Sequence, residues 1–169
     1  MVINKTSAGA VQGTFKNLPE GATFMAQGFP FRISYVGGDG NDVVLTQAPP
    51  IIYIEEGTTN RAVTLDSVTF VRGPLPLNTD HNFSVDHRTR VVFLTSSLGL
   101  NKPDPSVLTV QAAGFNLSVE GVGPFRGVTG LDGSCIVVRL PEGLPTGDLP
   151  MAITLRGMTS NTAILSISP

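Results

Sequence analysis

Short runs of alternating apolar and polar residues dominate this chain, and glycine, proline, asparagine or aspartate closes most of them. Alternation with a period of two, in segments rich in Val, Ile, Thr and Phe, is typical of half-buried β-strands. Apolar residues nowhere recur with helical spacing over three turns. The runs lie at 31–35, 63–65, 67–71, 90–94, 107–110, 116–119, 134–140, 151–155 and 163–167. The sequence therefore predicts an all-β protein.

The composition agrees with short strands joined by many turns. The 169 residues include 19 glycines and 13 prolines, 41% are hydrophobic and only 14% are charged. A formal net charge of −2 comes without a basic stripe that could neutralise phosphates, so we expect no nucleic-acid partner. No apolar run approaches the about 18 residues of a membrane helix, so we expect no membrane span. No signal peptide precedes the first run, so an exported chain is expected to be part of something longer or to be exported in another way.

The segment 47–50, Gln-Ala-Pro-Pro, predicts a linker, because consecutive prolines favour an extended backbone and cannot donate to a sheet ladder. Residues 1–48 are too few hairpin residues for an independent core, which predicts the terminal β-hairpin segment of a larger β-repeat domain. Residues 51–169 hold seven or eight short strands, which suits an immunoglobulin-like β-sandwich. Tryptophan is absent and cysteine occurs once, so the sandwich lacks the Cys–Trp–Cys framework of antibody domains.

Residues 151–168 predict a hairpin in which the strands 151–155 and 162–168 are joined by the turn 156–161. Gly157 and Asn161 are residue types that accept a positive φ, which tight turns require.

The stretch 37–45, GGDGNDVVL, fits the calcium-binding nonapeptide G-G-x-G-x-D-x-U-x at every specified position. Calcium sites of this kind form between successive turns of a parallel roll, and the chain contains one copy only. Asp39, Asn41 and Asp42 could supply part of the six to eight oxygens that calcium takes. We favour a glycine turn between the strands 31–36 and 42–46, with calcium at these three residues as the weaker alternative. No other metal or cofactor is expected.

Two Asp-His pairs, Asp80-His81 and Asp86-His87, lie in the polar segment 78–90. They could hold a metal if this segment folded back on itself, but their spacing matches no known metal motif. A solvated loop is the favoured interpretation. The chain also contains no Gly-x-Ser-x-Gly elbow that would present a nucleophilic serine.

Glu55 and Glu56 are adjacent, and adjacent residues of a strand point to opposite faces, so they do not form a cooperating acid–base pair. We expect them in a solvent-facing turn. Cys135 lies in an apolar run without a nearby histidine and is expected to be a small buried hydrophobe. No catalytic residue is predicted, and we do not expect an enzyme.

Residues 13–46, GTFKNLPEGATFMAQGFPFRISYVGGDGNDVVLT, resemble the closing segment of autotransporter-type β-strand-repeat regions in very large bacterial surface proteins. The family pattern pairs G-x-F-x-x-L-x-E-G-x-x-F with F-x-I-S-Y and G-G-x-G-N-D-V-x-L-T. The match is carried by Gly13, Phe15, Leu18, Glu20, Gly21, Phe24, Phe31, Ile33, Tyr35, Gly37, Gly38, Gly40, Asn41, Asp42, Val43, Leu45 and Thr46.

Residues 107–168 resemble an Ig-like C-terminal module of secreted proteins in some soil bacteria. The similarity is clearest in VVRLPEGLPTGDLPMAITLRGMTSNTAILSIS, which follows the pattern V-x-V-P-x-G-L-P-x-G-D-x-P and T-x-x-G-x-x-S-N-x-x-x-L-x-I. Leu140-Pro141 replaces a Val-Pro pair, and Arg156 replaces a glycine that often precedes Gly157. The resemblance implies a fold and no catalytic residues.

The resemblances and the turn-rich pattern together favour a non-catalytic structural or adhesion module of an exported bacterial surface protein. Such a module would act as a spacer, cap or docking domain at the cell surface or outside the cell, with a protein or glycan as partner. The alternative is a carbohydrate-binding β-sandwich, although such sites use exposed aromatic platforms and Tyr35 and Tyr53 are the only tyrosines. A hydrolase accessory or catalytic domain is the third hypothesis.

Overall fold

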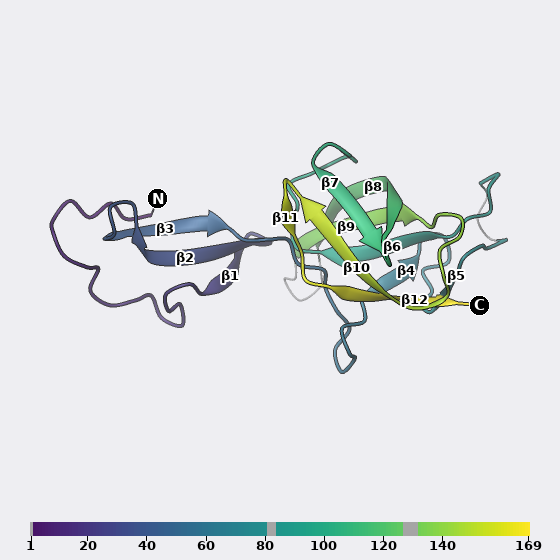
Figure 1. The fold of residues 1–169 in the computed structure, drawn as a ribbon, viewed down its shortest axis with the longest axis horizontal. Coiled ribbons are helices and arrows are strands. Elements are labelled where there is room, and N and C mark those ends of the chain that lie inside the picture. Colours follow the sequence, from purple (N-terminus) through teal and green to yellow (C-terminus); the bar gives the residue numbers. More distant parts are fainter. Residues whose placement is uncertain (1, 81–83, 127–131) are drawn as a thin grey trace. The chain divides into compact units, whose positions relative to one another are not determined.

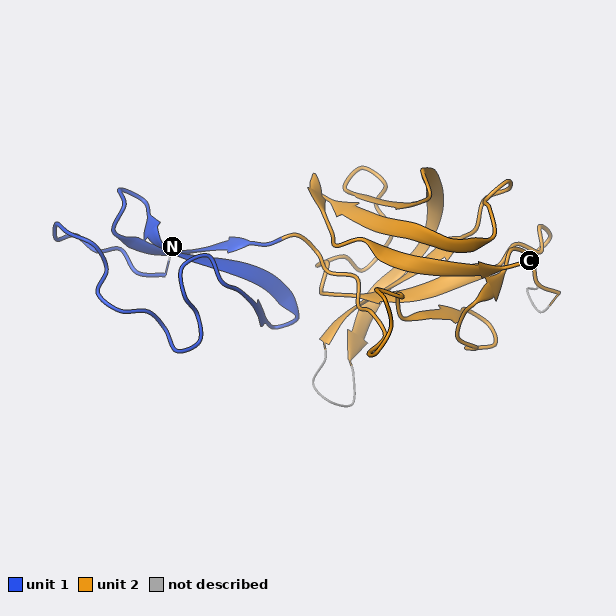
Figure 2. Ribbon diagram, turned by 60° about the horizontal axis from the view of Figure 1, so that its bottom comes forward, with its two compact units in different colours: residues 1–48 blue, residues 49–169 orange. Residues whose placement is uncertain are grey.

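The computed structural model describes residues 2–80, 84–126 and 132–169 (Figure 1). This part of the chain contains strands and turns but no helix, which confirms the all-β prediction and leaves no helix that could cross a membrane. The chain divides into two compact units, residues 1–48 and residues 49–169 (Figure 2). Each unit has its own sheet and its own buried apolar side chains.

Unit 1 (residues 1–48) is an antiparallel sheet in the order β1-β2-β3. Its strands are β1 (Thr23–Ala26), β2 (Phe29–Gly37) and β3 (Asp42–Gln47). β2 and β3 pair with each other across the intervening turn, as the alternating pattern predicts. The buried side chains of this unit are few: Ile33, Tyr35 and Val43 form its core. Because so small a core buries little apolar area, hydrogen bonds hold much of the surrounding chain in place.

Tyr35 fastens the loop that precedes β1. Its hydroxyl donates to the carbonyl oxygen of Leu18 at 2.7 Å and accepts from the N–H of Phe15 at 2.8 Å. The N–H of Tyr35 donates to Oε2 of Glu20 at 2.6 Å. All four residues belong to the motif of the first resemblance, so the motif has a local structural role: it closes a loop over a small core.

Unit 2 (residues 49–169) has nine strands within its described residues, and they hydrogen-bond in the order β4-β6-β9-β8-β7-β10-β12-β5 with β11 beside β10 (Figure 1). The strands are β4 (Thr64–Asp66), β5 (Leu75–Pro76), β6 (Arg90–Thr95), β7 (Leu108–Ala112), β8 (Phe115–Arg126), β9 (Asp132–Arg139), β10 (Gly147–Leu155), β11 (Met158–Thr159) and β12 (Ala163–Ser168).

β8 turns this continuous sheet into two layers by changing its partner. Leu117 lies opposite Val110 of β7, whereas Ser118 lies opposite Arg139 of β9. A register shift follows directly in β8, and such an irregularity bends a strand and increases its twist. The layers β4-β6-β9-β8 and β8-β7-β10-β12-β5 then face each other as a sandwich.

The far edges of the two layers also meet. Arg61, just before β4, forms a parallel bridge with Ile164 of β12. Ile164 donates its N–H to the carbonyl oxygen of Asn60 at 2.7 Å and accepts from the N–H of Ala62 at 2.9 Å. With this contact the sandwich comes close to a closed barrel.

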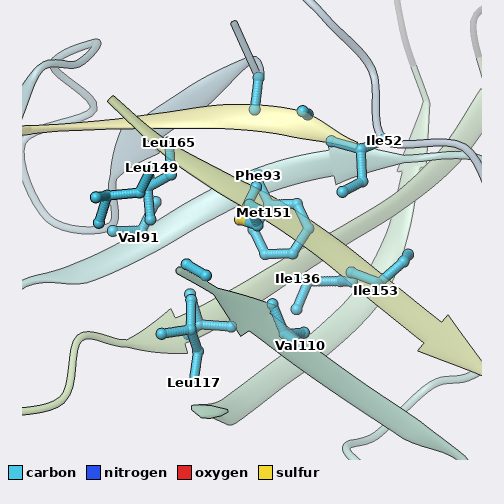
Figure 3. Packing of buried hydrophobic residues seen from close by; sticks show 14 of the residues in the cluster. Ile52, Val91, Phe93, Val110, Leu117, Ile136, Leu149, Met151, Ile153 and Leu165 are labelled. Atoms are coloured by element: carbon cyan, nitrogen blue, oxygen red, sulfur yellow. The ribbon is translucent and has the colours of Figure 1, made fainter. Parts of the chain in front are cut away.

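Alternate residues of facing strands fill the space between the layers. Val91 and Phe93 of β6 and Ile136 of β9 meet Met151 and Ile153 of β10 (Figure 3). All five are buried, and their neighbours along each strand face outward, as a period of two requires. Burial of each such side chain contributes about 1.5–3 kcal/mol.

The strand expected at 67–71 does not form. Asp66, which is 5% exposed, turns its carboxylate onto the chain that follows it. Its Oδ1 accepts from the N–H of Val68 at 2.9 Å and from the N–H and hydroxyl of Thr69 at 2.8 and 3.0 Å. Phe70 has a φ of +56°, a left-handed conformation that costs a bulky residue roughly 1–3 kcal/mol. The carboxylate offers the backbone a turn, and the turn replaces the strand.

The C-terminal hairpin forms between β10 and β12, but its turn differs from the expectation. Arg156 and Gly157 have positive φ, at 49° and 81°, whereas Asn161 does not. The Asn161 side chain instead binds the main chain of Ile52 from both sides: Oδ1 accepts its N–H at 2.8 Å and Nδ2 donates to its carbonyl oxygen at 3.1 Å. Asn161 therefore holds the first segment of the unit against the last hairpin.

Candidate functional site

The stretch that fits the calcium nonapeptide forms the turn between β2 and β3. A side chain at Gly38 would meet the Asp42 carboxylate, since an ideal Cβ there lies 2.0 Å from Oδ2. A side chain at Gly37 would meet Val44, with 2.2 Å between that Cβ and Cγ2. Gly38 also has a φ of +58°. The first two glycines of the pattern are thus explained by close packing of the turn itself.

The Asp42 carboxylate holds the start of the chain. Asp42 is 4% exposed, and its Oδ1 accepts the N–H of Lys5 at 2.9 Å. The neighbouring Ile3 pairs with Val43, whose N–H and carbonyl oxygen both bond to the main chain of Ile3. Asp42 therefore caps a short segment that is added to the edge of β3.

Two further contacts fix this segment. Nδ2 of Asn41 donates to the carbonyl oxygen of Ser7 at 3.0 Å. The Lys5 ammonium donates to the carbonyl oxygens of Ser7, Ala8 and Gly9 at 2.9, 3.0 and 2.6 Å. Three carbonyl oxygens thus surround a cation that belongs to the chain itself, the Lys5 ammonium group.

Asp39, the remaining candidate ligand, is exposed. Oδ1 of Asn41 is buried and has no hydrogen-bond partner among the described residues. Nowhere in the described ranges do three or more His, Cys, Asp or Glu side chains gather as a metal would need. These contacts give Asp42 and Asn41 a structural role, which is to bind the segment from Ile3 to Gly9.

The Asp42→Ala variant tests that role. We expect the amides of Lys5 and Val43 to exchange with solvent about tenfold to a hundredfold faster, because a hydrogen bond to a charged group contributes about 1.5–3 kcal/mol. Hydrogen exchange followed by NMR measures this directly. Asp39→Ala is the matched control and should leave both amides unchanged. Equal exchange in wild type and Asp42→Ala would contradict the role.

A second charged cluster lies on the outer face of the layer β4-β6-β9-β8. Arg90 and Arg139 sit directly opposite each other on β6 and β9. Like charges opposite each other are destabilising, and two carboxylates offset them here. Asp86 binds both arginines, and Glu120 binds Nε of Arg90 at 3.0 Å and Nε of Arg139 at 3.4 Å. Hydrogen bonds from Arg90, then Ser84 and Arg139, hold the pKa of the Asp86 carboxyl well below its usual range.

The two Asp-His pairs are only partly described. His81 lies outside the described residues. His87 has a φ of 49° and accepts the N–H of Thr79 through its carbonyl oxygen at 2.8 Å. Asp86 faces the arginines. Residues 85–87 thus form an exposed turn, as expected, and the ion pairs of Asp86 hold this turn against the sheet.

The thermal stability of the chain should depend on the protonation state of the Asp86 carboxyl. Its pKa is lowered in the folded chain, so the folded carboxyl stays ionised where the unfolded one, with a pKa of about 3.9, takes up a proton. Its contribution is therefore present above about pH 4 and is lost as the pH falls further. We expect Asp86→Asn to lower the melting temperature at neutral pH and to approach the wild type toward about pH 2.

Thermal unfolding at a series of pH values measures this. Glu56→Gln removes an exposed carboxylate of the same unit and serves as the control. A gap between wild type and Asp86→Asn that stayed constant across the acid range would count against the ion-pair account.

The remaining candidates of the sequence analysis are Glu55, Glu56 and Cys135. Glu55 pairs with Arg72 at 3.6 Å, and its carbonyl oxygen accepts from Thr58 in the turn that we expected. Glu56 is exposed. Cys135 is half-buried, not buried, because Ile136 faces the core and Cys135 therefore faces outward. The Cys135 thiol lies 3.6 Å from the carbonyl oxygen of Gly123.

A cavity that the sequence analysis did not anticipate opens in unit 2, where β7 and β8 part. It has a volume of about 360 Å³. Because β8 pairs with β9 beyond Leu117, the start of β7 is not paired with β8. Buried or half-buried aliphatic side chains line the inner part: Leu108, Val110, Leu117 and Val119. The border is formed by Pro103, Pro105, Thr109, Asn116 and Ser118.

The lining of this cavity is mostly apolar and uncharged. None of its lining residues carries a charge or titrates near neutral pH. An apolar interior with a few hydroxyl and amide groups at the mouth suits an apolar group presented by a partner. One feature of the sequence points to this cavity. Pro103 and Pro105 precede the run 107–110, and because proline cannot donate to a sheet ladder, the segment before that run is not paired as a strand.

Comparison of the chain with known protein families, with curated proteins and with solved structures finds no match.

Proposed function

We propose that the chain is a non-catalytic docking module of an exported bacterial surface protein, at the cell surface or outside the cell. In this proposal unit 2 is an immunoglobulin-like β-sandwich, and unit 1 is the cap of a β-repeat region. The partner is a protein segment that presents a single aromatic or aliphatic side chain.

The cavity between β7 and β8 carries this proposal. General acid–base or nucleophilic chemistry needs a titratable group within hydrogen-bond reach of the reacting atom, and the cavity lining offers none. Its volume of about 360 Å³ exceeds the about 150 Å³ that admits a benzene ring in an engineered cavity of another protein. The volume is therefore ample for one apolar side chain.

The role of unit 1 rests on its structure and on the first resemblance. Its core of Ile33, Tyr35 and Val43 is small for a domain. Its turns are secured by Asp42, Tyr35 and Lys5 through main-chain hydrogen bonds. A unit of this kind suits the end of a repeat array better than a binding site of its own.

The carbohydrate-binding alternative gains no support from the tyrosines. Tyr35 is buried in unit 1. Tyr53 is half-buried, and its hydroxyl donates to the carbonyl oxygen of Asp132 at 3.1 Å. Neither tyrosine offers the open aromatic face that a sugar platform requires, and docking of an apolar side chain is the function that we propose.

Binding of a small aromatic probe tests the docking function. We expect benzyl alcohol to shift the amide resonances of Leu108, Val110 and Leu117 in the full chain. Val119→Phe places a ring inside the cavity and should abolish these shifts. Val36→Phe adds a ring at an exposed position of unit 1 and should leave them intact. Shifts that were absent from the wild type, or that persisted in Val119→Phe, would overturn the proposal.

The proposed location has a separate test. Protease added to intact cells that produce the natural parent protein should degrade the segment that contains this chain, while a cytoplasmic marker survives. Protection of the segment until the cells are lysed would contradict a surface location.

A further inference from the structure

The loop 67–71 presents an aromatic side chain to solvent. Phe70 is 69% exposed, and Val68 and Val71 beside it are exposed as well. Within this loop, Ser-Val-Thr-Phe-Val, no residue carries a charge. Single exposed apolar residues are common on protein surfaces, but three within four positions form a projecting apolar tip.

The loop is preorganised rather than loose. The buried carboxylate of Asp66 accepts three hydrogen bonds from Val68 and Thr69. The main chain of Asp66 closes the loop, because its N–H donates to Val71 at 2.9 Å and its carbonyl oxygen accepts from Phe70 at 3.0 Å. Phe70 is held in the left-handed region by these contacts. A rigid tip loses little conformational entropy on binding, which favours a role in recognition.

The tip and the cavity are separated within one chain. The loop follows β4, the cavity borders β8, and β6 and β9 lie between these two strands in the sheet. Three strand spacings of about 4.8 Å place β4 and β8 roughly 14 Å apart. A protrusion and a cavity thus occupy opposite edges of one layer.

We propose that Phe70 of one copy of this chain enters the cavity between β7 and β8 of a second copy. This inference rests on the proposed docking function and names its partner. The contact joins two different surfaces, so it is heterologous: each copy offers one tip and one cavity, and copies join head to tail.

The charges around the two surfaces are complementary. Near the loop, the three carboxylates of Glu55, Glu56 and Asp66 are accompanied by two guanidinium groups, those of Arg61 and Arg72, which leaves one negative charge. Near the cavity mouth, Asp104 lies between Pro103 and Pro105, with Lys102 and Arg156 close to its carboxylate, which leaves one positive charge. The tip and the cavity lining are themselves uncharged, so no charge is buried when they meet.

The size of the contact sets its strength. A phenylalanine buries about 150–250 Å², whereas stable interfaces bury about 1,200 Å² or more in total. A single contact is therefore weak and transient. On a surface that displays many copies, the local concentration is high, and weak contacts add up.

Sedimentation of the full chain from micromolar to millimolar concentration tests the proposal. We expect the average mass of the wild type to rise with concentration, more steeply at low salt. Phe70→Ala lacks the tip and Val119→Phe lacks the cavity, so each should remain monomeric when alone. A mixture of the two should form a one-to-one dimer and nothing larger, because one supplies the cavity and the other supplies the tip. Val85→Ala, at a fully exposed valine, is the matched control and should behave as the wild type.

A wild type that stayed monomeric, a Phe70→Ala variant that still associated, or a mixture that failed to form the dimer would overturn the proposal. Thermal unfolding checks that Val119→Phe is folded, and Phe70→Ala alters a surface position only. If the wild type is monomeric but benzyl alcohol still shifts the cavity resonances, the self-association proposal is rejected and the docking function is retained. If the wild type is monomeric and benzyl alcohol causes no shifts, both proposals are rejected.

Discussion

The structure of unit 2 depends on one strand that belongs to both layers. β8 is 12 residues long and exchanges β7 for β9 between Leu117 and Ser118. No disulfide can tie the layers, since cysteine occurs once. Backbone continuity through β8, together with the packing of Phe93 against the facing β10, fixes their spacing. The cavity is a direct consequence. In a regular sheet β8 would continue along the start of β7, but here it pairs with β9 instead.

Acidic and amide side chains bind neighbouring chain segments at several points of the molecule. Asp42 caps the start of the chain, Asp66 builds the loop after β4, and Asp86 holds a segment against β6 and β9. Asn161 fixes the first segment of unit 2. In a chain in which only 14% of residues are charged, much of this small set serves internal contacts. Asp42 and Asp86, two aspartates that the sequence suggests as metal ligands, have main-chain and arginine partners in the structure.

Alternation predicted most strands well, because a period of two is a local property that burial of one face imposes. The strand predicted at 67–71 was wrong for an equally local reason. Asp66 offers a hydrogen-bond acceptor that competes with the sheet ladder, and a prediction from the hydrophobic pattern alone does not include that acceptor. The cavity and the outward position of Cys135 depend on which strands pair and in which register. Pairing joins residues far apart in the sequence, so neither follows from a single run. The ion pairs of Asp86 with Arg139 are non-local in the same way.

The parallel bridge between Arg61 and Ile164 has a mechanical consequence. Tension along the chain pulls the segment before β4 toward its N-terminal end and β12 toward its C-terminal end. Because the two run parallel, that force slides them past each other along their axis, and β5 and β12 are parallel as well. The hydrogen bonds at Ile164 then share the load and break together instead of opening one at a time. A chain held at both ends would thus resist stretching along this direction.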